Sequence, residues 1–292
     1  MLPLTRKFLS QRLRLPAICL ALLTIGTPAA SACTLFAANG PDWVQGGGTL
    51  IAKNRDWKPE WQEMRLNEQG TYRFYGIYTG DAQRMQLRGG VNEKGLAVLS
   101  ASASAIPKRE RMSMPQAAHS ALRTLLSDCA SVDEALCHTE LWLGPKFLLL
   151  ADADKIACIE IAPEGVYRLQ VLANAPLVHT NHYLEPDLIG ANERIGPSSA
   201  ARYARMSALL QDGPLPYELQ DFIRFSQDQA DGPDNSIWRT GSRTGSEQTL
   251  ASLVFHLQKG QTPEIYVKIR YAPDEQGQED VFTIDGSQLF AK

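Results

Sequence analysis

Cys33 is the residue with the most distinctive chemistry in this chain, because it follows a segment with the features of a cleavable leader. Residues 31–40 read SACTLFAANG, and a cut after Ala32 would leave Cys33 with both a thiol and a free α-amine. A thiolate is a strong nucleophile, and a neutral α-amine can accept the thiol proton directly or through one water. Cleavage would therefore unite a nucleophile and its base on one residue.

The leader itself is predicted over residues 1–32. Four basic residues precede the apolar stretch LPAICLALLTIG, and TPAASA then supplies the small-x-small pattern of a signal-peptidase site. The apolar stretch is shorter than the roughly 18 residues that a transmembrane helix needs. We therefore expect an exported protein, periplasmic or secreted, without a membrane span. A lipid anchor on Cys33 is the alternative, although Ala30 stands where a lipobox normally has leucine.

A cysteine nucleophile of this kind needs three helpers. A carboxylate near the α-amine would hold the amine in place and tune its pKa. N–H donors must face the oxyanion of the tetrahedral intermediate, typically an asparagine amide and a backbone N–H. A buried cation would hold the carboxylate and the thiolate in position. We therefore look for acidic, amide and basic residues in motifs that follow Cys33.

Five segments resemble the N-terminal-nucleophile (Ntn) hydrolases of the choloylglycine hydrolase, penicillin V acylase and penicillin acyltransferase superfamily. The similarity extends from Cys33 to about residue 205 and is weaker beyond. The segments are CTLF (33–36), AKNRDWKP (52–59), GGVNEKGLAVLSAS (89–102), LVHTNH (177–182) and GPSSAARYARM (196–206). The resemblance implies an α+β fold, a four-layer αββα sandwich with two antiparallel sheets, and hydrolysis of a linear amide C–N bond.

The resemblance also implies a role for each of four residues. Cys33 would be the nucleophile, and the carboxylate of Asp56 would contact its amine. Asn181 would supply the oxyanion amide, and Arg202 would lie beside the nucleophile. No metal or organic cofactor is expected for such a mechanism, and the partner would be a small N-acyl amide.

Two positions depart from the family pattern. Lys53 stands where choloylglycine hydrolases have an arginine, and lysine keeps the charge but loses the bidentate fork. Ser102 stands where many relatives have an asparagine that lines the site, so its backbone N–H becomes the expected oxyanion donor. Both differences favour acyltransferase-like amidases over the bile-salt branch. Penicillin V, N-acyl amino acids and N-acyl homoserine lactones are the substrates that the resemblance implies, and acyl transfer on the same scaffold stays open.

Other interpretations of the same motifs are weaker. His179 and His182 suggest a Cys–His protease or a metal site, but an extended His-x-x-His segment does not place both rings on one face, and no further ligand cluster is apparent. Asn92 and Glu93 lie in a turn that leads into a strand, which favours a structural role. Residues 232–241, GPDNSIWRTG, have the composition of a substrate-facing loop and equally of an ordinary surface loop.

Composition limits the partners. The chain has 292 residues and a formal net charge of −3, and loss of the basic leader would take this charge to about −7. No dense run of lysine and arginine indicates a nucleic acid or an anionic membrane as partner. Residues 33–292 are long enough for one large domain, which we expect to be the mature protein. The sequence leaves two possibilities open: the protein could form a homo-oligomer, and it could be a binding protein that kept the fold without catalysis.

The remaining cysteines are ambiguous. Cys19 belongs to the leader, and Cys158 lies in an apolar run where a small buried side chain is the simplest interpretation. Cys129 and Cys137 flank a short helical segment, so that an exported protein could join them in a disulfide or leave both as thiols.

Period-2 and helical patterns place these residues on a mixed fold. Apolar alternation predicts strands at 33–39, 48–54, 71–80, 95–104, 249–258 and 264–272, with three more within 146–172. Helical spacing predicts helices at 114–128, 131–141, 197–212 and 216–227, with Ser131 and either Ser198 or Ser199 as caps. Clusters of strands interrupted by pairs of helices indicate α+β topology with helices on the faces of antiparallel sheets.

Overall fold

The structure is a computed structural model that describes residues 32–80, 85–271 and 278–291. The predicted leader lies outside the described residues, apart from Ala32, which is the first residue of strand β1 (Ala32–Asn39). Among the described residues, no helix combines the length and the apolar character needed to cross a bilayer.

The strands of the described residues form two antiparallel sheets, as the sequence predicts. The first sheet has the order β10 (Pro176–His179), β1, β2 (Thr49–Trp57), β11 (Gln248–Leu257), β12 (Glu264–Arg270), β13 (Glu279–Asp285). The second sheet follows chain order: β3 (Gln62–Asn67), β4 (Phe74–Thr79), β5 (Gln86–Asn92), β6 (Ala97–Ser102), β7 (Lys146–Ala151), β8 (Ile156–Ile161), β9 (Tyr167–Leu172). The first sheet therefore combines strands from both ends of the chain, and the nucleophile strand β1 lies inside it.

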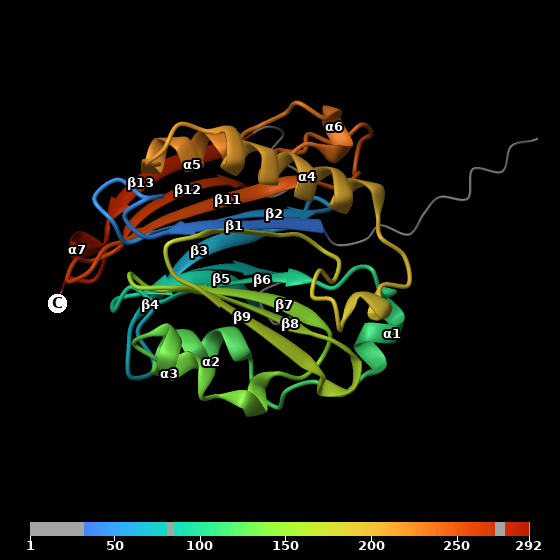
Figure 1. Cartoon of the computed structure of the whole chain (residues 1–292), viewed down its shortest axis with the longest axis horizontal. Coiled ribbons are helices and arrows are strands. Elements are labelled where there is room, and N and C mark those ends of the chain that lie inside the picture. Colours follow the sequence, from blue (N-terminus) through green and yellow to red (C-terminus); the bar gives the residue numbers. More distant parts are fainter. Residues whose placement is uncertain (1–31, 81–84, 272–277, 292) are drawn as a thin grey trace, which may run out of the picture.

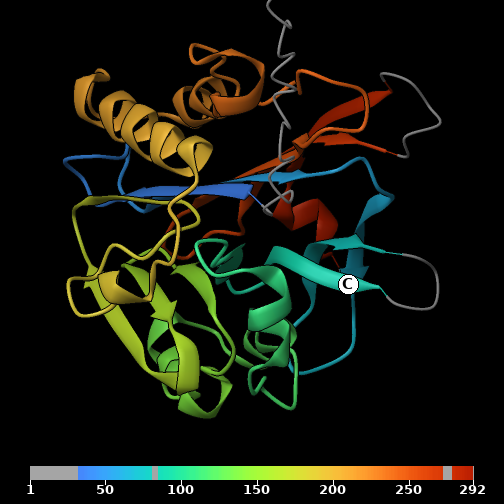
Figure 2. The same ribbon diagram turned by 90° about the vertical axis from the view of Figure 1, so that its right-hand side faces the viewer.

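Helices cover the outer face of each sheet, so that the molecule has four layers (Figures 1 and 2). The first sheet is covered by α4 (Pro197–Asp212), α5 (Leu219–Ser226) and the short α6 (Gly232–Asn235). The second is covered by α2 (Ala121–Asp128) and α3 (Val132–Leu136), while α1 (Lys108–Ser113) lies at one end of the sheets and α7 (Gly286–Leu289) follows β13. Single 3₁₀ turns occupy Thr139–Leu141, Pro163–Gly165 and Ile189–Ala191. The predicted αββα sandwich is confirmed.

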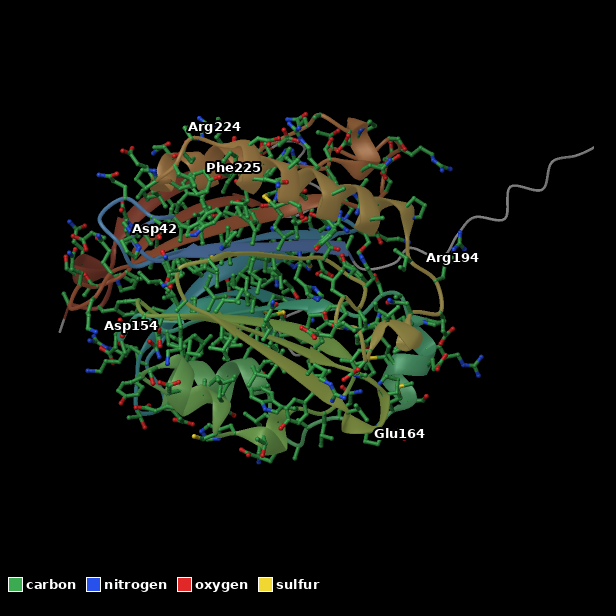
Figure 3. The ribbon with its side chains drawn as sticks, viewed as in Figure 1. Asp42, Asp154, Glu164, Arg194, Arg224 and Phe225 are labelled. Carbon is green, nitrogen blue, oxygen red and sulfur yellow. The ribbon has the colours of Figure 1, made fainter. Side chains whose placement is uncertain are left out.

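Three apolar clusters hold the layers together, because side chains alternate between the two faces of each strand. The central cluster fills the space between the sheets and includes Leu35, Leu99 and Phe147. Another lies between the second sheet and α2, and the third lies between the first sheet and α4 and α5. Charged side chains such as Asp154 and Arg224 lie on the outside (Figure 3).

Several sequence predictions of local structure need correction. Helix α2 begins at Ala121 instead of residue 114, because the side chain of Ser120 accepts a hydrogen bond from the Arg123 N–H and caps the helix there. Helix α4 begins with Pro197 after Gly196, so neither of the predicted serines is its cap. The polar strand β3, the glycine-containing β5, the short β10 and the terminal β13 were not predicted, because their patterns lack the apolar alternation of the other strands.

The two ambiguous cysteines are not joined in the structure. Cys129 and Cys137 are both free thiols, and the Cys137 thiol donates to the Asp133 carbonyl. Cys158 is buried, as its apolar neighbours predict. Cys33 is also a buried free thiol.

Candidate active site

Cys33 lies near the start of β1, directly opposite Arg55 on β2. Opposite residues of an antiparallel pair share a face, and Cys33 belongs to the cluster between the sheets, so its thiol points toward the second sheet. Its backbone N–H donates to Asn181 Oδ1 at 2.8 Å. The nitrogen that cleavage would convert into an α-amine is therefore held by the residue predicted to bind the oxyanion.

Asn181 is fixed from several sides just after β10. Its Nδ2 donates to the Ser102 carbonyl at 2.9 Å, which ties it to the end of β6. Its backbone N–H donates to Ser199 Oγ at 3.0 Å, and the same hydroxyl lies 2.9 Å from His182 Nδ1. These contacts leave the Asn181 side chain little freedom, which is the preorganisation that an oxyanion donor requires.

Arg202 is fully buried in α4 and binds the start of β1. Its Nη1 donates to the Cys33 carbonyl at 2.6 Å and to Thr34 Oγ1 at 2.8 Å, while its Nη2 donates to Asn181 Oδ1 at 3.0 Å. Its Nε lies 4.0 Å from Asp56 Oδ2. One guanidinium therefore contacts three of the residues that the sequence places in the site, as an arginine fork can.

Asp56 is the residue before the end of β2 and lies on the face opposite to the Cys33 thiol, toward α4. Thr249 Oγ1 donates to its Oδ1 at 2.8 Å, and Arg239 Nη1 lies 3.7 Å from its Oδ2. A β-bulge in β11 between Thr249 and Ala251 sets this register, as bulges near active sites often do. Burial raises the pKa of Asp56, while Arg202 and Arg239 act against that rise by favouring the carboxylate.

Lys53 is buried on the same face of β2 as Arg55 and points toward the second sheet. Its Nζ donates to the Arg88 carbonyl at 2.5 Å. Arg88 is the extra residue of a β-bulge in β5, where Ile77 pairs with Gly89 and Tyr78 with Leu87. Burial lowers the pKa of Lys53 to about 8.

A pocket of about 370 Å³ opens next to Cys33. Lys53, Asp56 and Ser102 all line it, together with Trp57 and residues of α1, β5, β6 and β7. Ser102 contributes the carbonyl that holds Asn181. The donor role of its backbone N–H stays a prediction.

The two histidines near Asn181 have separate structural partners. His179 Nε2 lies 3.0 Å from Glu160 Oε1, and burial lowers the pKa of His182 to about 4, so that His182 is neutral at physiological pH. Within the described ranges, no three histidine, cysteine or acidic side chains gather in a way that could hold a metal ion. Asn92 also has a structural role, because its amide bonds the Leu126 and Cys129 carbonyls.

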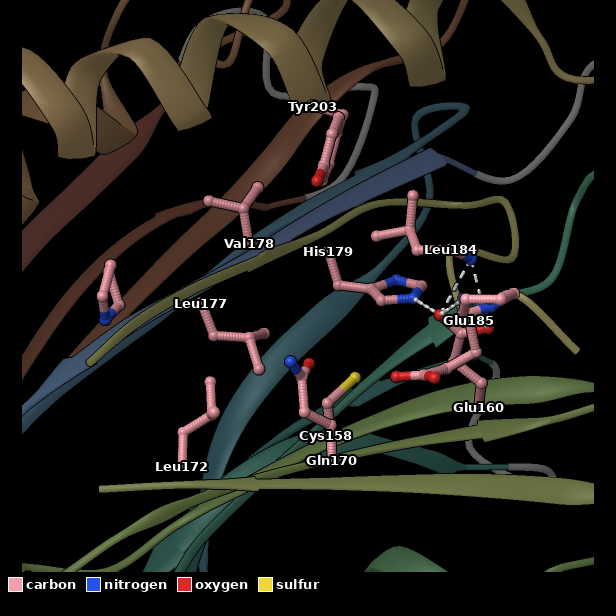
Figure 4. Close-up of a pocket in the computed structure, with 12 residues that line it drawn as sticks. Cys158, Glu160, Gln170, Leu172, Leu177, Val178, His179, Leu184, Glu185 and Tyr203 are labelled. Carbon is pink, nitrogen blue, oxygen red and sulfur yellow. Dashed lines mark hydrogen bonds and ion pairs between the residues drawn. The ribbon is translucent and has the colours of Figure 1, made fainter. Parts of the chain in front are cut away.

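A second cavity, of about 450 Å³, lies beside β8, β9 and β10 (Figure 4). Cys158, Glu160 and His179 line it, and Glu160 also accepts the backbone N–H groups of Leu184 and Glu185. Burial and the nearby carboxylates raise the pKa of the Cys158 thiol well above its ordinary value, the opposite of what a nucleophile needs. Glu160 therefore contacts His179 before Asn181 and the backbone of residues 184–185 after it, which fixes both ends of the segment that carries Asn181.

Sequence reasoning missed three residues of the site. Ser199 had been predicted as a helix cap and instead holds the Asn181 backbone. Thr249 lies in a strand whose period-2 pattern showed only that its neighbours are apolar, and Arg239 belongs to the ambiguous loop 232–241. That loop places Arg239, which is only 6% exposed, next to Asp56. The loop therefore contributes a buried charge to the site.

Comparison with known proteins identifies the family of the chain. The model of the family of acyl-coenzyme A:6-aminopenicillanic acid acyl-transferase matches residues 43–267. The match includes Asp56, Asn181 and Arg202, and it begins after Cys33. No curated protein matches the chain.

Solved structures with the same fold include three amide hydrolases. A variant of conjugated bile acid hydrolase from Clostridium perfringens has 14% identity and a TM-score of 0.54, over 88% of this chain and 93% of that chain. Penicillin V acylase from Agrobacterium tumefaciens has 17% identity and a TM-score of 0.50, over 88% and 87%. The Caenorhabditis elegans N-acylethanolamine-hydrolyzing acid amidase orthologue has 12% identity and a TM-score of 0.53, over 77% and 92%. The chain belongs to the acyl-coenzyme A:6-aminopenicillanic acid acyl-transferase family of the Ntn hydrolase superfamily.

Proposed function

We propose that the protein is an exported Ntn cysteine amidase that hydrolyses the amide bond of an N-acyl substrate through a thioester. The observation that carries this proposal is the environment of the Cys33 nitrogen, which donates to Asn181 Oδ1 at 2.8 Å while Arg202 holds the Cys33 carbonyl. Hydrolysis of the bond between Ala32 and Cys33 would turn this nitrogen into a free amine at the edge of the pocket.

Asp56 supports the same proposal. Its Oδ2 is buried and has no hydrogen-bond donor among the described residues. A buried carboxylate oxygen without a donor costs free energy, and the α-ammonium that cleavage would release could provide one. Ala32 lies opposite Asp56 in the β1–β2 register, so removal of the leader would open this position to the new amine.

The first half of the reaction follows from these positions. The Cys33 sulfur forms a bond to the substrate carbonyl carbon, and the thiol proton moves to the α-amine. The second Asn181 Nδ2–H and the backbone N–H near Ser102 would stabilise the oxyanion, since the first Nδ2–H is bonded to the Ser102 carbonyl. The C–N bond then breaks, and the ammonium returns its proton to the leaving amine.

The second half restores the enzyme. Water attacks the thioester and the α-amine accepts a proton from the water. The C–S bond then breaks, and the α-ammonium gives that proton to the departing sulfur, which restores the thiol and releases the carboxylic acid. Acyl transfer is the second candidate, because the matching family is named for an acyl-transferase. In that case an acceptor amine takes the place of water. Product analysis with a competing amine separates the two, since a transferase diverts the acyl group from water to the amine.

Replacement of the nucleophile is the primary test. The Cys33→Ser variant should lose at least about 1,000-fold in kcat/KM against N-acyl amides, because it removes the group that forms the acyl-enzyme. Its thermal unfolding should be unchanged, since serine fits the same volume. Mass spectrometry of the wild-type protein with substrate should show an acyl adduct on Cys33. Retention of amidase activity by Cys33→Ser would refute the mechanism.

Two measurements test the requirement for a free amine. An alanine inserted between Ala32 and Cys33 keeps the thiol but leaves its nitrogen in a peptide bond after cleavage, and we expect this variant to be inactive. The intact mass of the exported protein should correspond to a chain that begins at Cys33. A diacylglyceryl adduct on that residue would instead indicate a lipid-anchored protein without this catalysis.

A further inference from the structure

The pocket beside Cys33 has a charge opposite to that of the whole chain. Six basic side chains line the described part of the pocket, and Asp56 is the only carboxylate among the lining residues. The chain as a whole has a formal net charge of −3. A cleft of one sign with low-dielectric walls concentrates ligands of the opposite sign. The pocket is therefore electrostatically suited to an anion.

Four of these cations, which we call the cation cluster, belong to the wall opposite β2. They are Arg88 on β5, Lys108 and Arg111 on α1, and Lys146 at the start of β7. Lys108 and Arg111 are three residues apart and therefore lie on the same side of their helix. The bulge in β5 at Arg88 sets the direction of that side chain.

The cation cluster has no carboxylate partner among the described residues. No ion pair joins any of its four members to an acidic side chain in that part of the chain, whereas Arg55, deeper in the pocket, pairs with Glu60. Among the described residues, the side chains of Arg88 and Arg111 each donate only through Nε, to Thr79 Oγ1 at 2.9 Å and to the Ile106 carbonyl at 3.0 Å. The two Nη atoms of each fork are therefore left for another acceptor.

The remaining two members are also available to a ligand. Lys108 Nζ lies 5.4 Å from the centre of the Trp57 ring, a cation–π contact that leaves its N–H groups able to donate. Lys146 is half-buried, and its ammonium group has no hydrogen-bond partner within the described ranges. Burial lowers the pKa values of Lys146, Arg88 and Arg111, because each charge loses hydration. The carboxylate of Glu60 compensates part of this loss at Arg88, and within the described residues no carboxylate does so at Arg111 or Lys146. A bound carboxylate would supply that compensation.

We propose that the cation cluster is a subsite for a carboxylate of the substrate, so that the enzyme acts on N-acyl amides that carry this negative charge. This inference rests on the proposed function, because the subsite lies in the same pocket as Cys33. Trp57, Leu87 and Met112 also line the pocket and would contact the apolar part of such a substrate. The carboxylate can belong to the leaving amine, as in an N-acyl amino acid, or to the far end of a dicarboxylic acyl group.

Matched substrate pairs distinguish these two sources. N-phenylacetylglycine and N-phenylacetylglycinamide differ only in a charge on the amine side. N-glutaryl para-nitroanilide and N-pentanoyl para-nitroanilide have acyl groups of the same chain length, which end in a carboxylate and in a methyl group respectively. For one pair we expect kcat/KM to be at least roughly tenfold higher for the charged member, and the preference should decrease as salt is added.

Variants of the cation cluster identify its residues. Lys146→Gln and Arg111→Gln should each reduce the charged-to-neutral ratio of kcat/KM by roughly three- to tenfold, and the double variant should bring the ratio near one. Lys259→Gln is the matched control, because Lys259 is exposed and pairs with Asp154 away from the pocket. Its ratio should equal that of the wild type. An unchanged ratio in the double variant, or no preference in either pair, would overturn the subsite.

Binding separates this inference from the proposed function. The Cys33→Ser protein, titrated by calorimetry with the same four compounds, should bind the charged member of one pair roughly tenfold more tightly. If binding shows that preference and no compound is hydrolysed by the wild type, the subsite stands and the proposed function fails. If neither binding nor turnover depends on the charge, the subsite is refuted whatever the fate of the amidase mechanism.

Discussion

The two faces of strand β2 show opposite electrostatic arrangements. On the face toward α4, the buried carboxylate of Asp56 lies between Arg202 and Arg239, and Thr249 donates to it. On the face toward the second sheet, Lys53 and Arg55 line a pocket whose opposite wall carries the cation cluster. The face toward α4 is closed and nearly balanced in charge, because Arg239 also pairs with the largely buried Glu247, whereas the face toward the second sheet is open and has an excess of positive charge.

In the mechanism that we propose, this difference separates residues that position the nucleophile from residues that contact the substrate. Charges on the closed face interact with one another and with the start of β1, so their role is to fix Cys33 and Asn181. Charges of the cation cluster have no ion-pair partner among the described residues. For the partly buried members, the loss of hydration costs free energy unless a bound anion compensates it. Substitutions on the closed face should therefore change stability and kcat, whereas those on the open face should change substrate preference.

Arg202→Met on the closed face should have the largest effect. It leaves Asp56 with a weaker counter-charge and removes the donors to the Cys33 carbonyl and to Asn181. Loss of one partner from a buried charge pair costs about 3–5 kcal/mol, and we expect that loss in the free energy of unfolding measured in urea. Activity should fall at least about 100-fold.

Arg205→Met provides the control for that variant. Arg205 lies on the same helix, but its side chain is 34% exposed and pairs with Asp228. Its replacement should cost less than about 1 kcal/mol and leave kcat/KM unchanged. Equal effects of the two substitutions would show that the closed face does not hold the nucleophile.

Thr249→Val tests the same face with a smaller change. The hydroxyl donates to Asp56 Oδ1, which lowers the pKa of this carboxyl, so its loss should raise that pKa further. Asp56 must be ionised to hold the Cys33 amine, and the acid limb of kcat/KM should therefore move to higher pH. A hydrogen bond to a charged group contributes about 1.5–3 kcal/mol, and the loss in unfolding free energy should be larger at neutral pH than at a pH where Asp56 is protonated.

The pH profile of Thr249→Val can also contradict this role of Asp56. If the acid limb of kcat/KM stays at the wild-type position, Asp56 does not control activity. Thr34→Val is a useful comparison, because its hydroxyl contacts Arg202 instead of the carboxylate. That variant should lose stability without a shift of the acid limb.

The sequence identified four residues that lie together in the structure, but it identified fewer of the residues around them. Cys33, Asp56, Asn181 and Arg202 could be found because the residue type, chain order and flanking dipeptides all carry information, and the structure brings them together. Their catalytic roles remain predictions. The sandwich could also be predicted, since clusters of apolar alternation separated by helix pairs favour two antiparallel sheets.

Long-range and irregular features could not be predicted in this way. Arg239 and Thr249 reach Asp56 only because β11 pairs with β2 across almost 200 residues, with a bulge at Thr249. Arg88 likewise depends on a bulge in a strand whose glycines hide its pattern. The cation cluster comes from three separate elements, so no single segment shows the charge of the pocket.

Lys53→Arg should have the smallest effect and tests the open face through pH. Lysine loses its charge as the pH rises through its pKa, which burial lowers to about 8, whereas arginine stays charged. The affinity of the Cys33→Ser protein for the preferred charged amide should therefore fall by roughly threefold between pH 7 and 9, and the added Lys53→Arg substitution should reduce that fall. Arg55, Arg88 and Asp56 also act on this site, but their charges are the same in both proteins. Both proteins lack the Cys33 thiol and have the same α-amine at residue 33, so the difference between the two titrations reports Lys53 alone. Parallel titrations would place the carboxylate beyond the reach of Lys53, nearer to the α1 side of the pocket.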